Sequence, residues 1–554
     1  MASLKKLWKA KLDGRRWSIN KIESEILKSR DIFNLDRFLY PVEEDMLPLN
    51  SLKNIKEAAE IVINAINNNE KILVYYDTDT DGITSGTIIN RYLSHFVDKN
   101  LLTQYINDGK IHGLTSSAPC FNEKYDVIII VDSIQTEPAM YQMLLDIGSK
   151  IVVLDHHNIT MPVLAMQKKI HLVSSMNDYQ NPHLCGAGVA LKFCLYLDQI
   201  LNVDYANEYY DLAACGICAD MMNVGFESME NRYICYRGFG NLQNKAIKYI
   251  KGSYEMTSTT VSYSIAPLIN AANRMGKNWA ALKLFLSNED DEIIGCINEL
   301  KGCREKQNQI VEQVYTQIEK QAKEQENKKM MFFIIEDAEN VSGLIANRVL
   351  GQYQRPVVIT QERVDQTTGE EQYSGSLRAV GVDDFSKMVN KTRYAKAMGH
   401  SNAAGFVVSK KNKDKFINKI EEQLADKEFE QRVIVDIQLS QRQINKELIA
   451  WLKQLNRISG VGFPPITVMI EDVTDYEVGN MSSGKHTKIT TPYMLFIKWN
   501  CEDWEFIPDD GCFGAYGTLD QGFFGKTFNY RMIMEDYKVD ELLDLDEIFN
   551  KLTK

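Results

Sequence analysis

Short apolar runs alternate with longer helical stretches through the first half of the chain. Three strand-like runs end on acidic residues, and they span 71–76, 127–131 and 151–154. Helical stretches such as 83–97 and 186–200 alternate with runs of this kind. This alternation predicts a mostly parallel sheet with helices on both faces, whose ligand site lies at the carboxyl ends of the strands. We therefore assign residues 51–280 to an α/β domain.

The patterns elsewhere in the chain divide it further. Residues 1–50 look like a helical lead-in. Residues 281–328 contain almost no Gly or Pro and carry apolar residues at helical spacing, which predicts a long connecting helix; the apolar heptad is too irregular to favour a coiled coil. A smaller domain is expected over 329–428. Short β-like runs between Gly and Asp turns over 429–540 fit a small β-barrel, and residues 541–554 form an acidic tail.

The composition fits a soluble multidomain enzyme. A length of 554 residues suggests three or four domains. No apolar run approaches the roughly 18 residues that a membrane helix needs, and the N-terminus lacks the apolar core of a signal peptide. We expect no membrane partner and a cytoplasmic location, or the host cytoplasm if the chain is encoded by a virus. Ten scattered cysteines fit reduced thiols, and the isolated Cys215-Gly-Ile-Cys218 spacing favours a structural role.

The net charge changes this picture little. At −12 it argues at first sight against a nucleic-acid partner, but much of the negative charge lies in the strand-end acids and in local acidic patches. Basic residues crowd the N-terminus: Lys5, Lys6, Lys9, Lys11, Arg15 and Arg16. Such a cluster can contact a DNA backbone or a partner protein, although a solvated helix face is the better interpretation.

Four carboxylate-rich signatures carry the candidate chemistry. They are Asp77-Thr-Asp79-Thr-Asp81-Gly82, Asp132, Asp155-His156-His157, and Asp220, which closes the apolar stretch 212–219. Acids packed so densely repel one another, and their pKa values rise strongly unless a cation neutralises them. Oxygen ligands with imidazole suit manganese, magnesium or zinc, and hydrolytic two-metal sites share a carboxylate between the ions. The pattern predicts a metal centre for phosphoester chemistry.

Each signature alone has a simpler explanation. The first could be a calcium loop, but Ile88 stands where that loop needs a glutamate, and a strand precedes it. A single aspartate after an apolar run is more often a turn or a helix cap than a ligand. The Asp-His-His sequence could be a cap followed by surface histidines. Their joint occurrence, in one order and one strand-end setting, favours the metal centre.

The order of these signatures resembles that of the DHH phosphoesterase superfamily. Over about residues 45–540 the chain resembles the RecJ-type single-strand-specific exonucleases of that superfamily. The segments that carry the resemblance are 77–82, 132–133, 155–157, 186–192 with 218–220, 266–275, 374–378 and 398–406. The segment 266–275 is similar to an Asn-Ala-Gly-Arg motif, and the last two are similar to signatures of the DHH-associated domain.

The chain departs from the family pattern at several positions. Tyr75 stands where the family often has histidine, Asn273 replaces the glycine of Asn-Ala-Gly-Arg, and Met398 replaces the first glycine of Gly-Gly-His. Gly109, followed by Lys110, stands where RecJ usually has an arginine. None of these changes removes a metal-binding acid. They concern the phosphate grip and the substrate preference.

The resemblance implies a role for each site residue. It gives two divalent cations, Mn²⁺ or Mg²⁺, whose expected ligands are Asp79, Asp81, Asp132, His156 and Asp220, with Asp132 as the bridge. Asp77, also counted with the metal residues, would join Asp155 and His157 in orienting those ligands. The expected catalytic groups are His157 and three residues that would hold the scissile phosphate: Asn270, Arg274 and His400. The expected nucleic-acid contacts are Ser376 and Arg378, which would grip a terminal 5′-phosphate, with Gly399 and Lys110.

The resemblance also implies the domain roles and the activity. Residues 51–280 would be the DHH domain, 329–428 the DHH-associated domain, and 429–540 an OB-type barrel that binds single strands by stacking in a basic groove. The expected activity is metal-dependent 5′-to-3′ hydrolysis of single-stranded DNA by a two-metal mechanism, in recombination, repair or replication. The expected protein is a monomer whose partners are single-stranded DNA and a helicase or single-strand-binding protein.

Two other functions stay open. A phosphodiesterase of the same superfamily would act on short oligoribonucleotides or cyclic dinucleotides, although such enzymes tend to be shorter than this chain. An inactive nucleic-acid-binding scaffold would have no chemical need for the acids, and all four signatures retain theirs.

Overall fold

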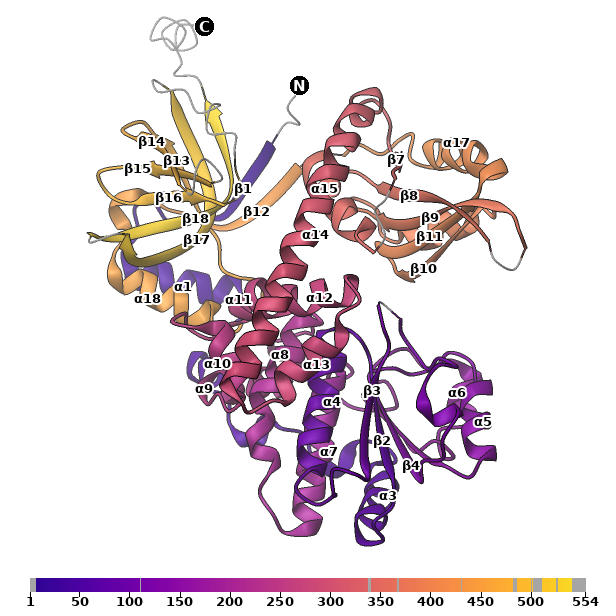
Figure 1. The fold of residues 1–554 in the computed structure, drawn as a ribbon. Coiled ribbons are helices and arrows are strands. Elements are labelled where there is room, and N and C mark those ends of the chain that lie inside the picture. Colours follow the sequence, from indigo (N-terminus) through magenta and orange to yellow (C-terminus); the bar gives the residue numbers. More distant parts are fainter. Residues whose placement is uncertain are drawn as a thin grey trace, which may run out of the picture.

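The computed structural model describes residues 6–540, with the exception of residues 110, 337–339, 366–367, 430, 482–485, 500, 502–510 and 525–526. Within the described residues the chain forms three sheets with helices packed around them (Figure 1). The predicted acidic tail, 541–554, lies outside the described residues. No described helix combines the length and the apolar character that crossing a membrane requires.

The first sheet is fully parallel, in the order β3-β2-β4-β5-β6. Its strands are β2 (Ile72–Tyr76), β3 (Leu102–Ile106), β4 (Val127–Val131), β5 (Lys150–Asp155) and β6 (Leu172–Ser174). Alternate residues enter different cores: Val74 and Ile129 pack on one face, and Tyr75 and Ile130 on the other. Strands buried on both faces need apolar residues throughout, which explains the continuous apolar runs. The predicted α/β architecture is confirmed.

Helices cover both faces of this sheet. The larger core contains α3 (Ile55–Asn67), α4 (Thr80–Leu93), α7 (Gly186–Leu201), α8 (Tyr210–Ala219), α9 (Met229–Gly240), α10 (Lys245–Lys251), α12 (Ala266–Arg274) and α13 (Asn278–Leu286). The other face is covered by α5 (Ala139–Asp146) and α6 (Met161–Ala165).

One long helix, α14 (Asp290–Glu324), joins two cores. Leu300 in its first half packs in the core of the first sheet, and Ile318 in its second half packs in the core of the next sheet. Its 35 residues span about 50 Å at 1.5 Å per residue. The predicted connecting helix, 281–328, starts too early because its first residues belong to the separate helix α13.

The second sheet has the order β10-β11-β9-β8-β7, in which only β7 and β8 are parallel. Its strands are β7 (Met331–Ile334), β8 (Val357–Val364), β9 (Glu371–Arg378), β10 (Ala395–His400) and β11 (Ala403–Ser409). α15 (Ser342–Tyr353) and α14 cover one face, and α16 (Phe385–Lys391) and α17 (Lys413–Gln423) cover the other. This is a smaller α/β unit at the far end of α14 (Figure 1).

The third sheet has eight strands, in the order β1-β12-β13-β17-β18-β16-β15-β14. They are β1 (Lys6–Asp13), β12 (Gln431–Gln438), β13 (Val468–Val473), β14 (Glu477–Met481), β15 (His486–Thr490), β16 (Leu495–Lys498), β17 (Cys512–Phe524) and β18 (Thr527–Asp540). Its core also holds α1 (Ile19–Ser29), α2 (Leu35–Leu39) and α18 (Lys446–Asn456). No pairing among the described residues closes the sheet, so the predicted barrel is an open sheet here, with β1 on the edge beside β12.

The strand β1 corrects the prediction that residues 1–50 form a helical lead-in. It pairs in parallel with β12, more than 400 residues away in sequence. Trp8 and Leu12 are partly buried, and Lys9 and Lys11 between them are exposed. This period of two indicates a strand. The lysines that suggested a solvated helix face lie instead on an edge strand, where charged side chains discourage pairing with another chain.

An ion pair fastens the N-terminal segment to the third sheet. Arg30, at the end of α1, donates through Nε and Nη2 to the two carboxylate oxygens of Asp436, at 2.8 and 2.5 Å. Asp436 also accepts from the backbone N–H of Thr467 at 3.0 Å. Burial alone would raise the pKa of Asp436, but these hydrogen bonds outweigh it and hold the pKa below its ordinary value.

The attachment of α1 should therefore be lost in acid. The lowered pKa of Asp436 means that the ion pair stabilises the fold above the pKa of an unfolded aspartate, about 3.9, and that this contribution disappears as the pH falls through the folded pKa. Hydrogen exchange of the α1 amides should be slower in the wild type than in Asp436→Asn at pH 7, and the difference should vanish toward pH 3. If the difference in exchange rate between the wild type and Asp436→Asn persists in acid, the ion pair is not what attaches α1 to the sheet.

Candidate metal centre

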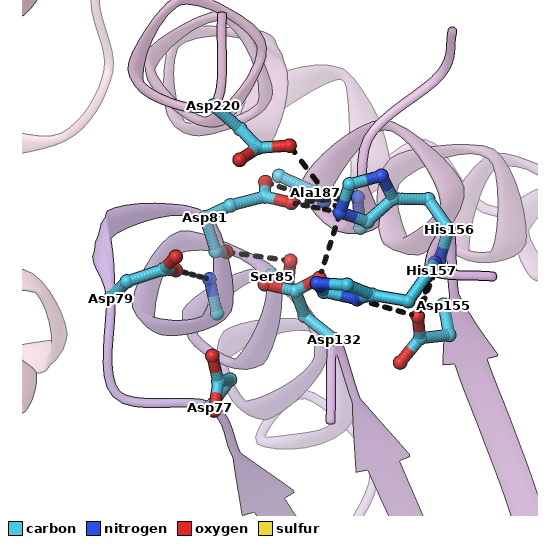
Figure 2. A network of polar contacts seen from close by, with 12 residues as sticks. Asp77, Asp79, Asp81, Ser85, Asp132, Asp155, His156, His157, Ala187 and Asp220 are labelled. Carbon is cyan, nitrogen blue, oxygen red and sulfur yellow. Dashed lines mark hydrogen bonds and ion pairs between the residues drawn. The ribbon is translucent and has the colours of Figure 1, made fainter. Parts of the chain in front are cut away.

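Three acids lie side by side because three neighbouring parallel strands end there. Asp77 follows β2, Asp132 follows β4, and Asp155 is the last residue of β5. Figure 2 shows their side chains gathered at this edge with those of His156 and neighbouring acids. The ends of these neighbouring parallel strands therefore bring the three acids together at one edge of the sheet, as expected from the sequence.

Two more acids come from helix ends. Asp79 caps α4 by accepting the N–H of Gly82 at 3.0 Å. Asp81, in the first turn of α4, accepts the N–H groups of Gly186 and Ala187, the first residues of α7, at 2.8 and 3.0 Å. A helix N-terminus stabilises an anion, so α7 favours the ionised form of the buried Asp81.

His156 stands at the centre of the cluster. Its Nε2 lies 3.6 Å from Asp81 Oδ2, 3.2 Å from Asp132 Oδ1 and 3.4 Å from Asp220 Oδ2. Asp220, at the end of α8, is the most open of these acids. Three overlapping groups of donor atoms are close enough to share a metal ion: Asp132, His156 and His157; Asp81, His156 and Asp220; and Asp77, Asp79 and Asp132.

Asp155 organises the two histidines. Its fully buried carboxylate accepts backbone N–H groups from Ile134 at 2.8 Å and from His156 and His157 at 2.7 Å each. His157 Nδ1 lies 3.0 Å from the same carboxylate, so this ring nitrogen is the donor. Burial would raise the pKa of Asp155, but the His157 hydrogen bond and charge hold it below its usual range. Burial opposes the reciprocal effect on His157, whose pKa rises to about 9.

The ionised forms of the remaining acids are disfavoured without a compensating positive charge. Burial, followed by the neighbouring carboxylates, raises the pKa of Asp132 well above its ordinary value and that of Asp220 to about 8. Burial also raises the pKa values of Asp77 and Asp81. Asp132 Oδ1 is buried and has no hydrogen-bond partner among the described residues. An orphaned carboxylate oxygen beside imidazole nitrogen and other acids fits a divalent cation such as Mn²⁺ or Mg²⁺.

Two glycines keep space around these acids. A Cβ at Gly216 of α8 would lie 2.3 Å from Asp81 Oδ1, and one at Gly186 would lie 2.9 Å from Asp132 Oδ1. Both distances are well inside van der Waals contact, so a larger residue at either position would push the carboxylates apart. Asp132 itself has a left-handed backbone, with φ of 55°, which directs its side chain into the cluster.

His112 belongs to the site, although the sequence analysis missed it. Its Nδ1 lies 3.4 Å from Asp77 Oδ2, and its ring centroid is 4.6 Å from that of His157. Its only signal was its place in the loop after β3, six residues beyond the end of that strand, whereas the acids lie directly at the ends of theirs. The run Leu-Thr-Gln-Tyr-Ile of β3 is too polar to stand out as a buried strand.

A second group of predicted residues lies next to the cluster on α12. Thr80 Oγ1, beside Asp79, donates to Asn270 Oδ1 at 3.4 Å. Arg274, one turn further along α12, donates to Asn270 O at 3.0 Å and to Gln307 Oε1 of α14 at 3.3 Å. The structure therefore brings Asn270 and Arg274 to the edge of the carboxylate cluster.

The predicted terminal-phosphate residues lie on β9, beside the start of α15. Ser376 Oγ is 2.9 Å from Ser342 Oγ, and Arg378 Nε donates to Asn347 Oδ1 at 2.9 Å. Burial lowers the pKa of the Arg274 guanidinium, and the positive charge of Arg378 lowers it further.

Two predicted residues, His400 and Gly399, are not joined to the cluster by any contact among the described residues. His400 is exposed on β10, and its side chain forms no hydrogen bond or ion pair with other described residues. Gly399 precedes it with a left-handed φ of 135°. Lys110 lies outside the described residues.

Comparisons with known proteins agree with this geometry. Residues 71–217 match the DHH family, N-terminal domain. YorK, a prophage-derived protein of Bacillus subtilis that carries the name of a single-strand DNA-specific exonuclease, is 28% identical over 550 residues, which cover 90% of this chain and 92% of YorK. The single-stranded-DNA-specific exonuclease RecJ of Thermus thermophilus is 28% identical over 381 residues, which cover 66% of this chain and 54% of that protein.

The fold comparison extends over almost the whole chain. The crystal structure of Thermus thermophilus RecJ in complex with Mn²⁺ superposes with a TM-score of 0.76 and 22% identity, covering 97% of this chain and 80% of that one. The three sheets and α14 therefore follow the RecJ arrangement. Residues 71–217 therefore match a DHH-family domain, and the chain is similar to RecJ in sequence and in fold.

Proposed function

We propose that this chain is a metal-dependent exonuclease that removes nucleotides from the 5′ end of single-stranded DNA. The observation that carries the proposal is the buried cluster of acids and imidazoles, bordered by Asn270 and Arg274. An acidic cluster alone would repel a phosphodiester. The guanidinium of Arg274 beside the cluster offers a positive charge that can bind the phosphate. The names of YorK and RecJ support this substrate class.

The proposed metal residues are Asp77, Asp79, Asp81, Asp132, His156 and Asp220, for two divalent cations. Bound there, the cations would lower the pKa of a water molecule and offset charge on the phosphate. Asp155 and His157 would fix the orientation of the neighbouring imidazole, as their short hydrogen bond allows. Asn270 and Arg274 would orient the scissile phosphate. His400 and Gly399 would complete the site from β10 when substrate is bound between the two α/β units.

Ser376 and Arg378 are the proposed grip for the terminal 5′-phosphate. A guanidinium and a hydroxyl suit a phosphate dianion. Asn347 accepts from Nε of Arg378 and the carbonyl of Leu377 accepts from Nη1 at 2.7 Å, which leaves Nη2 for the ligand. Residues 51–280, 329–428 and 429–540 would then supply the metal centre, the end-binding site and a surface for the rest of the strand. We infer a role in DNA recombination, repair or replication, with a helicase or single-strand-binding protein as partner.

Replacing Arg378 with alanine should remove the preference for a 5′-phosphate. Hydrogen bonds to charged groups contribute about 1.5–3 kcal/mol, so kcat/KM for a phosphorylated strand should fall roughly 10- to 100-fold. The same constant for a 5′-hydroxyl strand should change little. Arg348→Ala is the control, because Arg348 of α15 pairs with Glu312 instead. If Arg378→Ala keeps the wild-type preference for a 5′-phosphate, Arg378 does not bind the terminal phosphate.

The experiment that tests the activity uses Mn²⁺ and single-stranded DNA labelled at its 3′ end, with and without a 5′-phosphate. Parallel reactions contain a cyclic dinucleotide and a linear dinucleotide. We expect progressive shortening of the long strand from its 5′ end, abolished by EDTA. Cleavage of only the small substrates would place the chain with the short-substrate phosphodiesterases, and binding without any cleavage would favour the scaffold.

A further inference from the structure

A continuous helix links the three parts of the molecule. The segments α11 (Ser258–Thr260), η6 (Val261–Ile265) and α12 follow one another without a break, and we call them helix 258–274. Its first end is bonded to the third unit: Ser258 N donates to Arg457 O at 3.0 Å, and Ser459 N donates to Ser258 Oγ at 3.1 Å. Figure 1 shows α12 beside α14, with which it packs.

The other end of helix 258–274 reaches the catalytic groups. Asn270 is bonded to Thr80 beside the acids, and Asn340, from the smaller α/β unit, donates to Arg274 O at 3.4 Å. Burial lowers the pKa of Arg274, and the positive charge of Arg378 lowers it further. The helix therefore runs from the proposed phosphate site toward the C-terminal sheet.

One face of this helix is open. Its apolar residues Val261, Ile265, Leu268, Ile269, Ala271 and Ala272 are all buried. The residues left partly or fully exposed at helical spacing are Tyr263, Pro267, Asn270 and Arg274, and we call them the open stripe. The spacing of i, i+4, i+7 and i+11 places these four on one face. The open stripe is continuous with the two residues proposed to hold the scissile phosphate.

Tyr263 is the unusual member of the stripe. It is 73% exposed, and no hydrogen bond, ring contact or cation contact joins it to another described residue. Pro267 lacks the N–H that would bond to the carbonyl of Tyr263, and the helix widens at that point into the π turn η6. The sequence thus presents a bare aromatic ring where the helix is locally distorted.

We propose that Tyr263 is a stacking platform for a base of the DNA strand on the 3′ side of the cleavage site, and that the open stripe guides this strand toward the C-terminal sheet. The proposal rests on the proposed exonuclease function and adds a specificity residue to it. Tyr263 lies seven residues from Asn270, or about 10 Å along the helix axis. We place the base stacked there on the third nucleotide or a later one, which a dinucleotide does not contain.

The test compares substrate lengths. For a long single strand, Tyr263→Ala should raise KM about 5- to 30-fold, the range expected for losing one base–aromatic stack. For a 5′-phosphorylated dinucleotide, the same variant should match the wild type. Tyr263→Phe and Tyr263→Trp should keep the wild-type KM, because the ring and not the hydroxyl makes the contact. Tyr249→Ala, at a 41% exposed tyrosine on α10, is the matched control.

An abasic nucleotide locates the contact. When the abasic position is scanned along the strand, one position should raise the KM of the wild type and have no further effect on Tyr263→Ala. This inference would be overturned if the wild type cleaves single-stranded DNA but the effect of Tyr263→Ala depends neither on substrate length nor on an abasic position. The exonuclease proposal would then remain intact. A wild type that cleaves no DNA strand would overturn the exonuclease proposal and this inference with it.

Discussion

Asp132→Asn should abolish hydrolysis while the protein stays folded. Asp132 takes part in two of the three possible metal-holding groups, and its Oδ1 is buried without a hydrogen-bond partner among the described residues. A bound metal contributes several kcal/mol of charge stabilisation, and each 1.36 kcal/mol is a factor of ten. We expect kcat to fall by about 1,000-fold or more. The measurement is the initial rate on a 5′-phosphorylated single strand with Mn²⁺.

The same substitution should stabilise the metal-free protein. Asparagine has nearly the shape of aspartate but carries no charge, so the repulsion from the neighbouring acids is relieved. In EDTA the Tm of Asp132→Asn should exceed that of the wild type. Added Mn²⁺ should raise the Tm of the wild type much more than that of the variant, since binding to the folded state is what stabilises it.

Asp178→Asn is the control for both effects. Asp178 has a similar left-handed backbone, with φ of 59° against 55° for Asp132, but its side chain is 85% exposed. Its substitution should change neither the rate nor the Mn²⁺ shift in Tm. A normal Mn²⁺ shift in Asp132→Asn would show that the metal is held elsewhere.

Arg232→Met should destabilise the junction of three chain segments. Arg232 of α9 is 1% exposed and donates to Phe38 O at 2.6 Å and to Val224 O and Ile458 O at 3.0 Å each. Its guanidinium lies 3.4 Å from the ring centroid of Phe38 and 5.5 Å from that of Phe463. Methionine would fill most of the volume but leave three buried carbonyl groups without a donor.

The expected loss is about 3–5 kcal/mol, the usual range for breaking a buried charged network. Because a protein with several domains need not unfold in one step, the measurement is the lowest unfolding transition together with the rate of limited proteolysis. Arg232→Lys should also destabilise, since an ammonium cannot reproduce the planar fork. Arg237→Met, one turn along α9, should have a small effect. Equal effects at both positions would contradict the role assigned to Arg232.

The sequence was sufficient to predict the acids because their setting is local. A buried parallel strand must be apolar, and an acid directly after it must lie at the carboxyl edge of the sheet. Asp77, Asp132 and Asp155 follow this rule. His112 falls outside this rule, because it lies six residues beyond β3, and that edge strand is only partly buried and so has a mixed composition. The rule depends on recognising the strand, and edge strands are the hardest to recognise.

Long-range features were less predictable. The contact of Arg232 with three carbonyl groups and the approach of Arg378 to Arg274 depend on segments more than 100 residues apart. The strand β1 has the period of two, but its lysines and short length resemble a solvated helix. The described residues of 429–540 form an open sheet and not the expected barrel, because strand patterns indicate a β-rich unit without indicating which edges pair.

The pairing of β1 with β12 sets a condition on how the chain folds during synthesis. About 425 residues separate Lys6 from its partner Gln431. At about 5–20 residues per second, β1 leaves the ribosome roughly 20 to 90 s before β12 exists. Throughout this interval an amphipathic strand has no native neighbour, and its exposed Lys9 and Lys11 limit pairing with other nascent chains. The third sheet therefore includes a strand that was translated long before its neighbour, so a product truncated before residue 431 would leave β1 without this partner.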